Sequence, residues 1–369
     1  MLAAPIIAAA MLVQPAEVIL AQPGRTPIAS PALPPTPTSP PPDLSAQNKP
    51  VQDEINPALD EAVNRGLEAL VKMQNDDGSF GTGRFQRNVA VTSLACLALM
   101  ADGHVPGRGK YGKNVASGLE YVLSCVTETG LIAGDSGSGP MYGHGFAALF
   151  LGEIYGMTRG GGETAQADRV HEAVVKAVRL IERTQNDEGG WRYNPVPYDA
   201  DVSVTICQVM ALRSARNAGL EVSKTVIDRA VAYIRACQNP DGGFRYMRDG
   251  GISAWPRSAA GVASLYYAGI YDDQAVRDGL KYLRAISAPE NPMRAEAHYW
   301  YGMYYTAQTM YLAGGQDWAT WWPQGRAEML QRQRESGEWT DPGVGSAYGT
   351  AMALIVLQMP KRYLPIFQK

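Results

Sequence analysis

Two histidines and two glutamates fall in apolar segments of the sequence, where groups that exchange protons are uncommon. His144 and His298 are two of only four histidines in the chain, and either could serve as a catalytic proton partner near neutral pH. A histidine in such a segment can equally be a hydrogen-bonded residue of the core. Glu153 and Glu296 must each be paired or functional, because burial of an unpaired carboxylate is costly.

The segment YDADVS, residues 198–203, places Asp199 and Asp201 two positions apart. It directly precedes an apolar helical segment that begins at Val202. Side chains of this type accept hydrogen bonds from the free N–H groups of a first helical turn and so cap the helix. On the residues alone, the acidic pair is therefore a candidate helix cap.

Aromatic side chains are concentrated in the segment HYWYGMYY, residues 298–305. They cover most of the circumference of the helix expected there, and another aromatic residue heads the preceding apolar helix. Such faces could stabilise a carbocation, stack on sugar rings or fill a core. The candidates for contact with a ligand are Trp255, His298, Tyr299, Trp300, Tyr301 and Tyr304.

Composition limits the classes of protein that need to be considered. The chain has 369 residues, of which 46% are hydrophobic, so it can bury a full core. Its net charge of -3 and the lack of a dense Lys/Arg run exclude a nucleic-acid partner. The four cysteines include no CxxC pair and no neighbouring histidine at the spacing of metal ligands, and we expect no metal or other cofactor.

The N-terminal part of the sequence differs from the rest. Residues 2–13 form an apolar run that is too short to span a bilayer, and we interpret residues 1–21 as a signal peptide of an exported protein, periplasmic or extracellular. Residues 22–50 contain ten of the 25 prolines and act as an extended, disordered tether. The folded domain should therefore comprise residues 51–369.

One turn sequence recurs along this domain. The stretch QNDEGGWRY, residues 185–193, has near copies that begin at Gln74 and Gln238. Each copy follows an amphipathic helical pattern and precedes a more apolar one, so the unit is a helix hairpin with an outer and a buried inner arm. An Arg-Tyr pair follows the turn at residues 192–193 and 245–246. These arginines could bind carboxylates on neighbouring hairpins or form surface pairs.

The spacing of the turns accommodates six hairpins, and a period of about 50 residues marks a repeat architecture. We predict an all-α fold, an α/α toroid in which six hairpins form an inner and an outer ring. The N-termini of the inner helices then meet at one rim, which is favourable for anions. Counting from the turn glutamines sets Asp201 opposite Ala90. The match of residues 142–144, YGH, to residues 348–350, YGT, adds His144 to the rim.

The turns resemble the QW-type repeats of the squalene and terpene cyclases and of the protein prenyltransferase β subunits. The likeness covers roughly residues 55–360. In that superfamily the glutamine and the aromatic residue of each turn tie neighbouring hairpins together. The resemblance thus implies structural roles for Gln74, Gln185, Gln238, Phe80, Trp191, Phe244 and Trp339.

The resemblance also implies a chemical role for YDADVS. The segment stands where cyclases that begin by protonating an alkene carry D-x-D-D, with Val202 in place of the last acid. The likeness implies that Asp201 is the general acid and that Asp199 holds or polarises it. The prenyltransferase zinc site, D-x-C with a distant histidine, has Ser203 and Thr350 in its places here, and we expect no zinc.

Three functions fit these observations. The first is a divergent cyclase-like toroid that binds an isoprenoid or similar hydrophobic ligand in a central aromatic cavity. If catalytic, it would be an isomerase or lyase of the terpene cyclase type that cyclises its ligand with acid. The second is an exported carbohydrate-active toroid with two carboxylates across a groove, and the third is a non-catalytic binding module. We expect a hydrophobic small-molecule partner and a peripheral contact with a membrane, and the sequence identifies no protein partner.

Overall fold

The computed structural model describes residues 54–134, 139–158, 165–287, 291 and 298–368. The proposed signal peptide and tether, residues 1–50, and Glu296 lie outside the described residues. The described part is helical, with isolated β-bridges and no strand. None of its helices is both long and apolar enough to cross a membrane.

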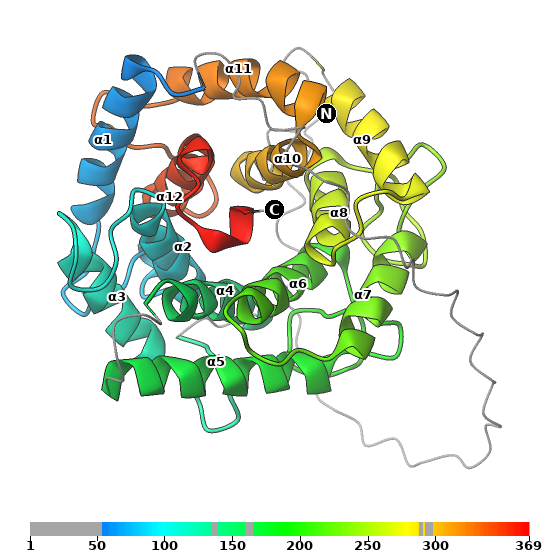
Figure 1. Ribbon diagram of the computed structural model, residues 1–369, viewed down its shortest axis with the longest axis horizontal. Coiled ribbons are helices and arrows are strands. Elements are labelled where there is room, and N and C mark those ends of the chain that lie inside the picture. Colours follow the sequence, from blue (N-terminus) through cyan, green and yellow to red (C-terminus); the bar gives the residue numbers. More distant parts are fainter. Residues whose placement is uncertain (1–53, 135–138, 159–164, 288–290, 292–297, 369) are drawn as a thin grey trace, which may run out of the picture. The chain divides into compact units, whose positions relative to one another are not determined.

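Within the described residues, twelve α-helices alternate between an outer and an inner ring (Figure 1). The outer helices are α1 (Pro57–Val71), α3 (Gly112–Ser124), α5 (Ala165–Thr184), α7 (Lys224–Ala236), α9 (Gln274–Ile286) and α11 (Gly315–Gln331). The inner helices are α2 (Val89–Met100), α4 (Met141–Thr158), α6 (Val202–Asn217), α8 (Trp255–Tyr267), α10 (Tyr299–Ala313) and α12 (Ser346–Leu357).

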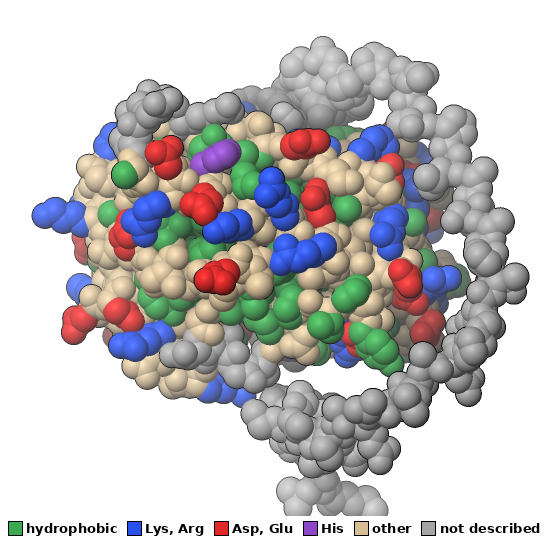
Figure 2. All heavy atoms as spheres, turned by 90° about the horizontal axis from the view of Figure 1, so that it is seen from below, with side chains coloured by type: hydrophobic (Ala, Val, Ile, Leu, Met, Phe, Trp, Pro, Cys, Tyr) green, Lys and Arg blue, Asp and Glu red, His purple; other side chains and the backbone are tan. Residues whose placement is uncertain are grey.

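Each inner helix contacts the next one around the ring, and α12 contacts α2. Figure 1 shows the resulting closed circle with the outer helices wrapped around it. The predicted all-α toroid of six hairpins is therefore confirmed. On the outer face shown in Figure 2, basic and acidic side chains are interspersed, as expected for the solvent side of amphipathic helices.

The helix boundaries follow from local sequence. At α1, Pro57 occupies the first helical position, and the Asn56 side chain accepts a hydrogen bond of 2.9 Å from the Leu59 N–H. Helix α1 buries one stripe of its surface, whereas every residue of α2 except Ala90 is buried. The amphipathic outer arm and the buried inner arm agree with the predicted hairpin.

In four of the turns, a glutamine joins its hairpin to the next one. Gln185 Nε2 donates to the Gly189 carbonyl of its own turn at 2.8 Å and to the Val226 carbonyl of α7 at 2.9 Å. Gln74, Gln238 and Gln333 make the same pair of bonds in their own units. Because Gln333 bonds to Ala62 of α1, the last hairpin is joined to the first.

The aromatic residue of the turn is held by a hydroxyl on the inner helix. The Trp191 N–H donates to Thr205 Oγ1 at 3.1 Å. The same bond links Phe80 to Thr92, Phe244 to Ser258 and Trp339 to Thr350. The implied structural role of the turn glutamines and aromatic residues is thus confirmed by their contacts.

The chain turns toward the inside of the ring after its last inner helix. After α12 it passes through two 3-10 helices, η3 (Met359–Lys361) and η4 (Pro365–Phe367). Helix η4 contacts the inner helices α4 and α6, and Figure 1 shows this segment inside the ring.

Candidate functional site

Asp201 caps the inner helix α6. It is fully buried, and its Oδ1 accepts a hydrogen bond of 2.9 Å from the Val204 N–H. Asn88 caps α2 in the same way through the Val91 N–H. Asp201 therefore corresponds to Asn88, and the predicted alignment of Asp201 with Ala90 was wrong. The error arose because the connection from the turn glutamine to the cap of the inner helix is two residues longer in the third unit than in the first.

The other carboxylate oxygen of Asp201 faces an arginine. Arg192 Nε lies 3.7 Å from Asp201 Oδ2, and Arg192 Nη1 lies 2.5 Å from Asp199 Oδ2. One guanidinium group thus holds both members of the acidic pair, and it belongs to the same hairpin. Asp199 is partly exposed and pairs with Arg192, so only Asp201 caps the helix.

Two tyrosines complete the surroundings of this carboxylate. Tyr246 Oη donates to Asp201 Oδ2 at 3.3 Å, and the hydroxyls of Tyr246 and Tyr193 are hydrogen-bonded to each other. The Arg192 guanidinium lies 5.1 Å from the centre of the Tyr193 ring and 5.7 Å from that of Tyr246. Because the Val202 N–H also donates to the Tyr246 carbonyl, the fourth hairpin docks on the start of α6.

Burial raises the pKa of Asp201 to about 6. The Val204 N–H and the charge of Arg192 act in the opposite direction, because both stabilise the ionised carboxylate. The balance leaves a carboxyl group that is substantially protonated in mildly acidic solution. Such a group can exchange a proton in a pH range where an ordinary aspartate cannot.

The first turns of three other inner helices also meet here. Tyr142 of α4 lies within electrostatic reach of Asp201 and Tyr246, and Tyr301 of α10 lies within reach of Asp201 and of Tyr348 on α12. Tyr301 Oη donates to the carbonyl of Ser203 at 3.2 Å. The N-terminal ends of α4, α6, α10 and α12 therefore form a common rim, which was predicted.

Behind this rim the aromatic rings pack on one another. The ring centres of Tyr301 and Tyr305 lie 4.7 Å apart, and those of Tyr304 and Tyr305 lie 4.9 Å apart. Phe146 of α4 approaches Tyr304 edge-on, and Cys207 Sγ lies 3.6 Å from Tyr305 Oη. Of the predicted ligand contacts, Tyr301 and Tyr304 belong to this cluster.

The remaining aromatic candidates pack within the wall. Trp255 Nε1 donates to Thr306 Oγ1 of α10 at 2.9 Å. Two further bonds connect Trp300 to the Thr340 carbonyl and Tyr299 to Glu328 of α11. His298 precedes α10 as an exposed residue with a left-handed φ of 61°. The structure thus separates these four residues from the aromatic cluster.

His144 has the contacts of a turn anchor. Its Nδ1 accepts a hydrogen bond of 3.1 Å from the Ile132 N–H, as Thr350 does from Trp339 in the sixth unit. The match of YGH to YGT is therefore confirmed. Complete burial lowers the pKa of His144 to about 4, so the imidazole is neutral near pH 7.

Arg192, Tyr193, Tyr246 and Tyr142 were not among the predicted site residues. The recurring Arg-Tyr pair was the available signal, and Arg192 does bind carboxylates, although within its own hairpin. Arg245 instead donates to the Ala236 carbonyl. Position after the turn therefore does not fix the role of the arginine.

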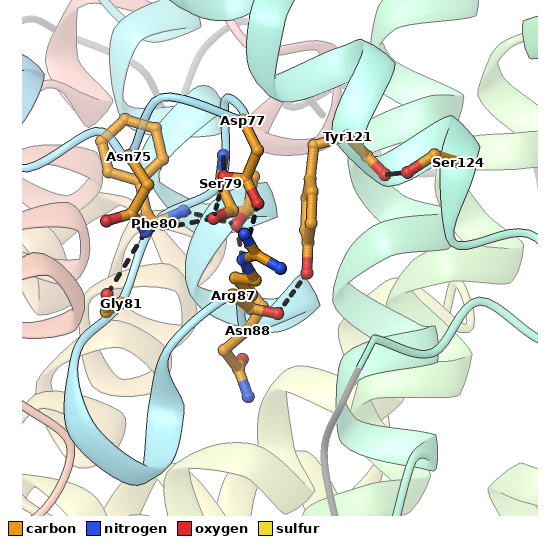
Figure 3. A network of polar contacts seen from close by, with 10 residues as sticks. Asn75, Asp77, Ser79, Phe80, Gly81, Arg87, Asn88, Tyr121 and Ser124 are labelled. Atoms are coloured by element: carbon orange, nitrogen blue, oxygen red, sulfur yellow. Dashed lines mark hydrogen bonds and ion pairs between the residues drawn. The ribbon is translucent and has the colours of Figure 1, made fainter.

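A separate cavity of about 440 Å³ lies between the first and second hairpins. Figure 3 shows the polar network beside it, in which Arg87 Nε lies 2.9 Å from Asp77 Oδ2 and the Tyr121 hydroxyl donates to the Arg87 carbonyl. The charges at this cavity are thus paired with each other. Nowhere in the described part of the chain do three or more His, Cys, Asp or Glu side chains gather as a metal site would require.

Comparisons with known proteins agree with the architecture. The family model of the prenyltransferase alpha-alpha toroid domain matches residues 56–284. The chain is similar to ligand-free MstE, a type II terpene cyclase from Scytonema, at 14% identity and a TM-score of 0.58, over 83% of this chain and 99% of that chain. A variant of MstE in complex with its substrate, geranylgeranyl dihydroxybenzoate, gives 13% identity and a TM-score of 0.56, over 83% and 98%.

A protein from Actinoplanes is similar at 16% identity and a TM-score of 0.52, over 81% of this chain and 98% of that chain. No curated protein matches the sequence. At these identities the solved structures establish the fold, and the chemistry depends on the residues of this chain.

Proposed function

The chain belongs to the prenyltransferase α/α-toroid family, and from this membership we propose that its ring binds an isoprenoid or similar branched hydrocarbon and cyclises it with acid. The observation that carries the proposal is Asp201: a fully buried carboxyl group at the rim, with a pKa raised to about 6 and with tyrosine rings nearby. The structures of MstE with a geranylgeranyl substrate support this ligand class by analogy.

The proposed reaction needs three contributions from the chain. Protonated Asp201 transfers its proton from Oδ2 to a terminal alkene carbon of the ligand, which leaves a carbocation on the neighbouring carbon. The rings of Tyr142 and Tyr301 stabilise the cation while ring closure proceeds. Arg192, 3.7 Å from Asp201 Oδ2, stabilises the carboxylate that remains. A proton lost from the product cation restores the acid.

Two observations favour a second function, the binding of the same ligand without turnover. Arg192 stabilises the ionised form of Asp201, and Val202 is buried where the likeness would place a further acid. The first feature reduces the fraction of Asp201 that carries the proton to be donated, and the second leaves the site with one fewer acid. By contrast, Asp199 and Asp201 share one guanidinium on one side of the rim, which does not provide carboxylates on opposite sides of a sugar.

The experiment is the substitution Asp201→Asn, assayed with squalene and with geranylgeranyl diphosphate and analysed by mass spectrometry of the products. We expect turnover to disappear while thermal stability near pH 4, where Asp201 is protonated, changes little, because Asn88 already caps α2 with an amide. Asp201→Ala is the matched control for the cap and should cost about 0.5–2 kcal/mol of stability. If wild type and Val202→Asp are both inert and neither ligand shifts the Tm, the isoprenoid proposal is wrong.

A further inference from the structure

The C-terminal segment, residues 363–368, occupies the inside of the ring. At Arg362 the backbone adopts a left-handed φ of 58°, and the chain then turns toward α4 and α6. Three apolar side chains of the segment are buried there: Leu364, Ile366 and Phe367. Figure 1 shows this segment within the circle of inner helices.

Glu153 of α4 holds this segment by its backbone. Its Oε2 accepts a hydrogen bond of 2.9 Å from the Ile366 N–H, and its Oε1 accepts one of 2.7 Å from Ser214 Oγ of α6. The carboxyl group is buried, and burial raises its pKa to about 7. The described phenols of Tyr267 and Tyr304 interact electrostatically with this carboxyl group.

The attachment of the chain weakens along this path. Before the turn at Arg362, Gln358 donates to the Ala98 carbonyl and Lys361 forms an ion pair of 2.6 Å with Asp102. After the turn, the bond from Ile366 to Glu153 is the one hydrogen bond between described residues that joins residues 363–368 to the helices. The remaining attachment is apolar contact, which another apolar molecule can replace.

The seat and the proposed site at the rim lie along the same two inner helices. Tyr142 and Asp201 stand at the N-terminal ends of α4 and α6, whereas Glu153 and Ser214 lie near their C-terminal ends. Tyr304 lies within electrostatic reach of both Glu153 and Cys207, and Cys207 lies within reach of Asp201. A ligand long enough to extend from the rim along α4 and α6 would meet residues 363–368.

We propose that this seat is a second apolar binding site, which holds the chain's own residues 363–368 at rest and takes the branched hydrocarbon end of the ligand once the segment has left. The inference rests on the proposed ligand class. Leu364, Ile366 and Phe367 offer the same branched and aromatic surface to α4 and α6 that an isoprenoid chain would offer. The segment thus competes with long ligands for the apolar surface of α4 and α6 inside the ring.

Hydrogen exchange of the full-length protein tests the exchange of occupants, with geranylgeraniol as the probe. The Ile366 N–H is protected by Glu153 in the resting protein. We expect the probe to speed exchange in residues 363–368 and to slow exchange in the first turn of α6. If the α6 turn becomes protected and the segment does not open, the seat is not a ligand site, although the proposed function stands.

Binding measurements on two variants provide a second test. A chain that ends at Arg362 should bind geranylgeraniol about tenfold more tightly, equivalent to about 1.4 kcal/mol. Ile366→Pro removes the N–H donor and the branched side chain of Ile366 but keeps Leu364 and Phe367, and it should give a smaller gain in the same direction. Ser214→Ala is the matched control, because it removes the other hydrogen bond of Glu153 and leaves the segment in place.

The outcomes separate the two proposals. Equal affinity of wild type, Ile366→Pro and the shortened chain would overturn the seat alone, since the rim would still bind the probe. Absence of binding to all three proteins would overturn the isoprenoid function, and the seat with it. If the shortened chain fails to fold, Ile366→Pro and the exchange experiment still decide between these outcomes.

Discussion

At the scale of single residues, Asp201 combines two tasks on one carboxyl group. Oδ1 caps α6, while Oδ2 faces Tyr246 and Arg192. The cap could be predicted from sequence, because it depends on the residues that immediately follow. The surroundings of Oδ2 could not, because Tyr246 comes from the next hairpin and no local pattern specifies which hairpins touch.

The raised pKa of Asp201 predicts how folding stability depends on pH. Its value of about 6 exceeds the ordinary 3.8, so the folded protein binds this proton more tightly than the unfolded chain. The associated stability is present below about pH 4 and is lost as pH rises through 6. Asp201→Asn removes this dependence and keeps the cap. In urea unfolding, we expect the free energy of unfolding of the variant, relative to that of wild type, to rise by up to about 3 kcal/mol between pH 4 and pH 8.

A constant difference between Asp201→Asn and wild type across this range would contradict the raised pKa. Asn88→Asp is the matched control. This substitution replaces the amide that caps α2 with a carboxyl group and leaves Asp201 unchanged, so the pH dependence that is due to Asp201 should persist. The same protonation governs the proposed chemistry, so turnover should decline as pH rises through about 6.

At the scale of helices and turns, five of the six hairpins are closed, within the described residues, by a backbone N–H that meets a side-chain acceptor on the inner helix. Thr205 performs this task for Trp191, and His144 performs it for Ile132. The use of histidine at this position explains its burial without a catalytic role. The sequence match of YGH to YGT reflects a shared contact, because His144 and Thr350 each accept a hydrogen bond from the backbone N–H of the turn in their own unit.

Thr205→Val tests the importance of this acceptor. Valine has nearly the shape of threonine but leaves the buried Trp191 N–H without its partner, so we expect a loss of about 1–3 kcal/mol in the free energy of unfolding. Thr205→Ser keeps the hydroxyl and should lose less, since Ser258 holds Phe244 in the fourth unit. Denaturant unfolding of both variants makes the comparison. Equal losses would show that packing of the methyl group matters more than the hydrogen bond.

The twelve helices were predictable because apolar periodicity is a local property of the chain. The direction of individual aromatic side chains was not. An inner helix such as α10 is buried on nearly all sides, so its sequence does not indicate which face looks inward. Trp300 and Tyr301 are neighbours on this helix, yet Tyr301 joins the aromatic cluster and Trp300 bonds to Thr340 in the wall.

At the scale of the whole molecule, the last hairpin meets the first through the same joint that links three other pairs of neighbouring hairpins. Gln333 donates to the Ala62 carbonyl of α1. One turn further along α1, Gly66 faces the Trp339 ring of the sixth unit. The equivalent joints place Gly118 of α3 against Cys96 and Gly279 of α9 against Val262. Closure thus requires no special element.

Two glycine substitutions, one in this joint and one outside it, should have opposite effects on stability. A methyl group added at Gly66 would lie 2.6 Å from the Trp339 ring and 2.9 Å from Leu354, both of which are buried, so Gly66→Ala should overpack the closing joint and cost about 1–3 kcal/mol. Gly156→Ala is the matched control in α4, where the added methyl group would lie 3.6 Å from Ala218 Cβ, an ordinary contact. Because alanine favours the helix, this control should gain about 0.5–1 kcal/mol. Thermal unfolding of the two variants compares their stabilities directly. If the Gly66→Ala protein is as stable as the control, α1 can shift without loss of stability. The ring then does not depend on tight contact between its first and last hairpins.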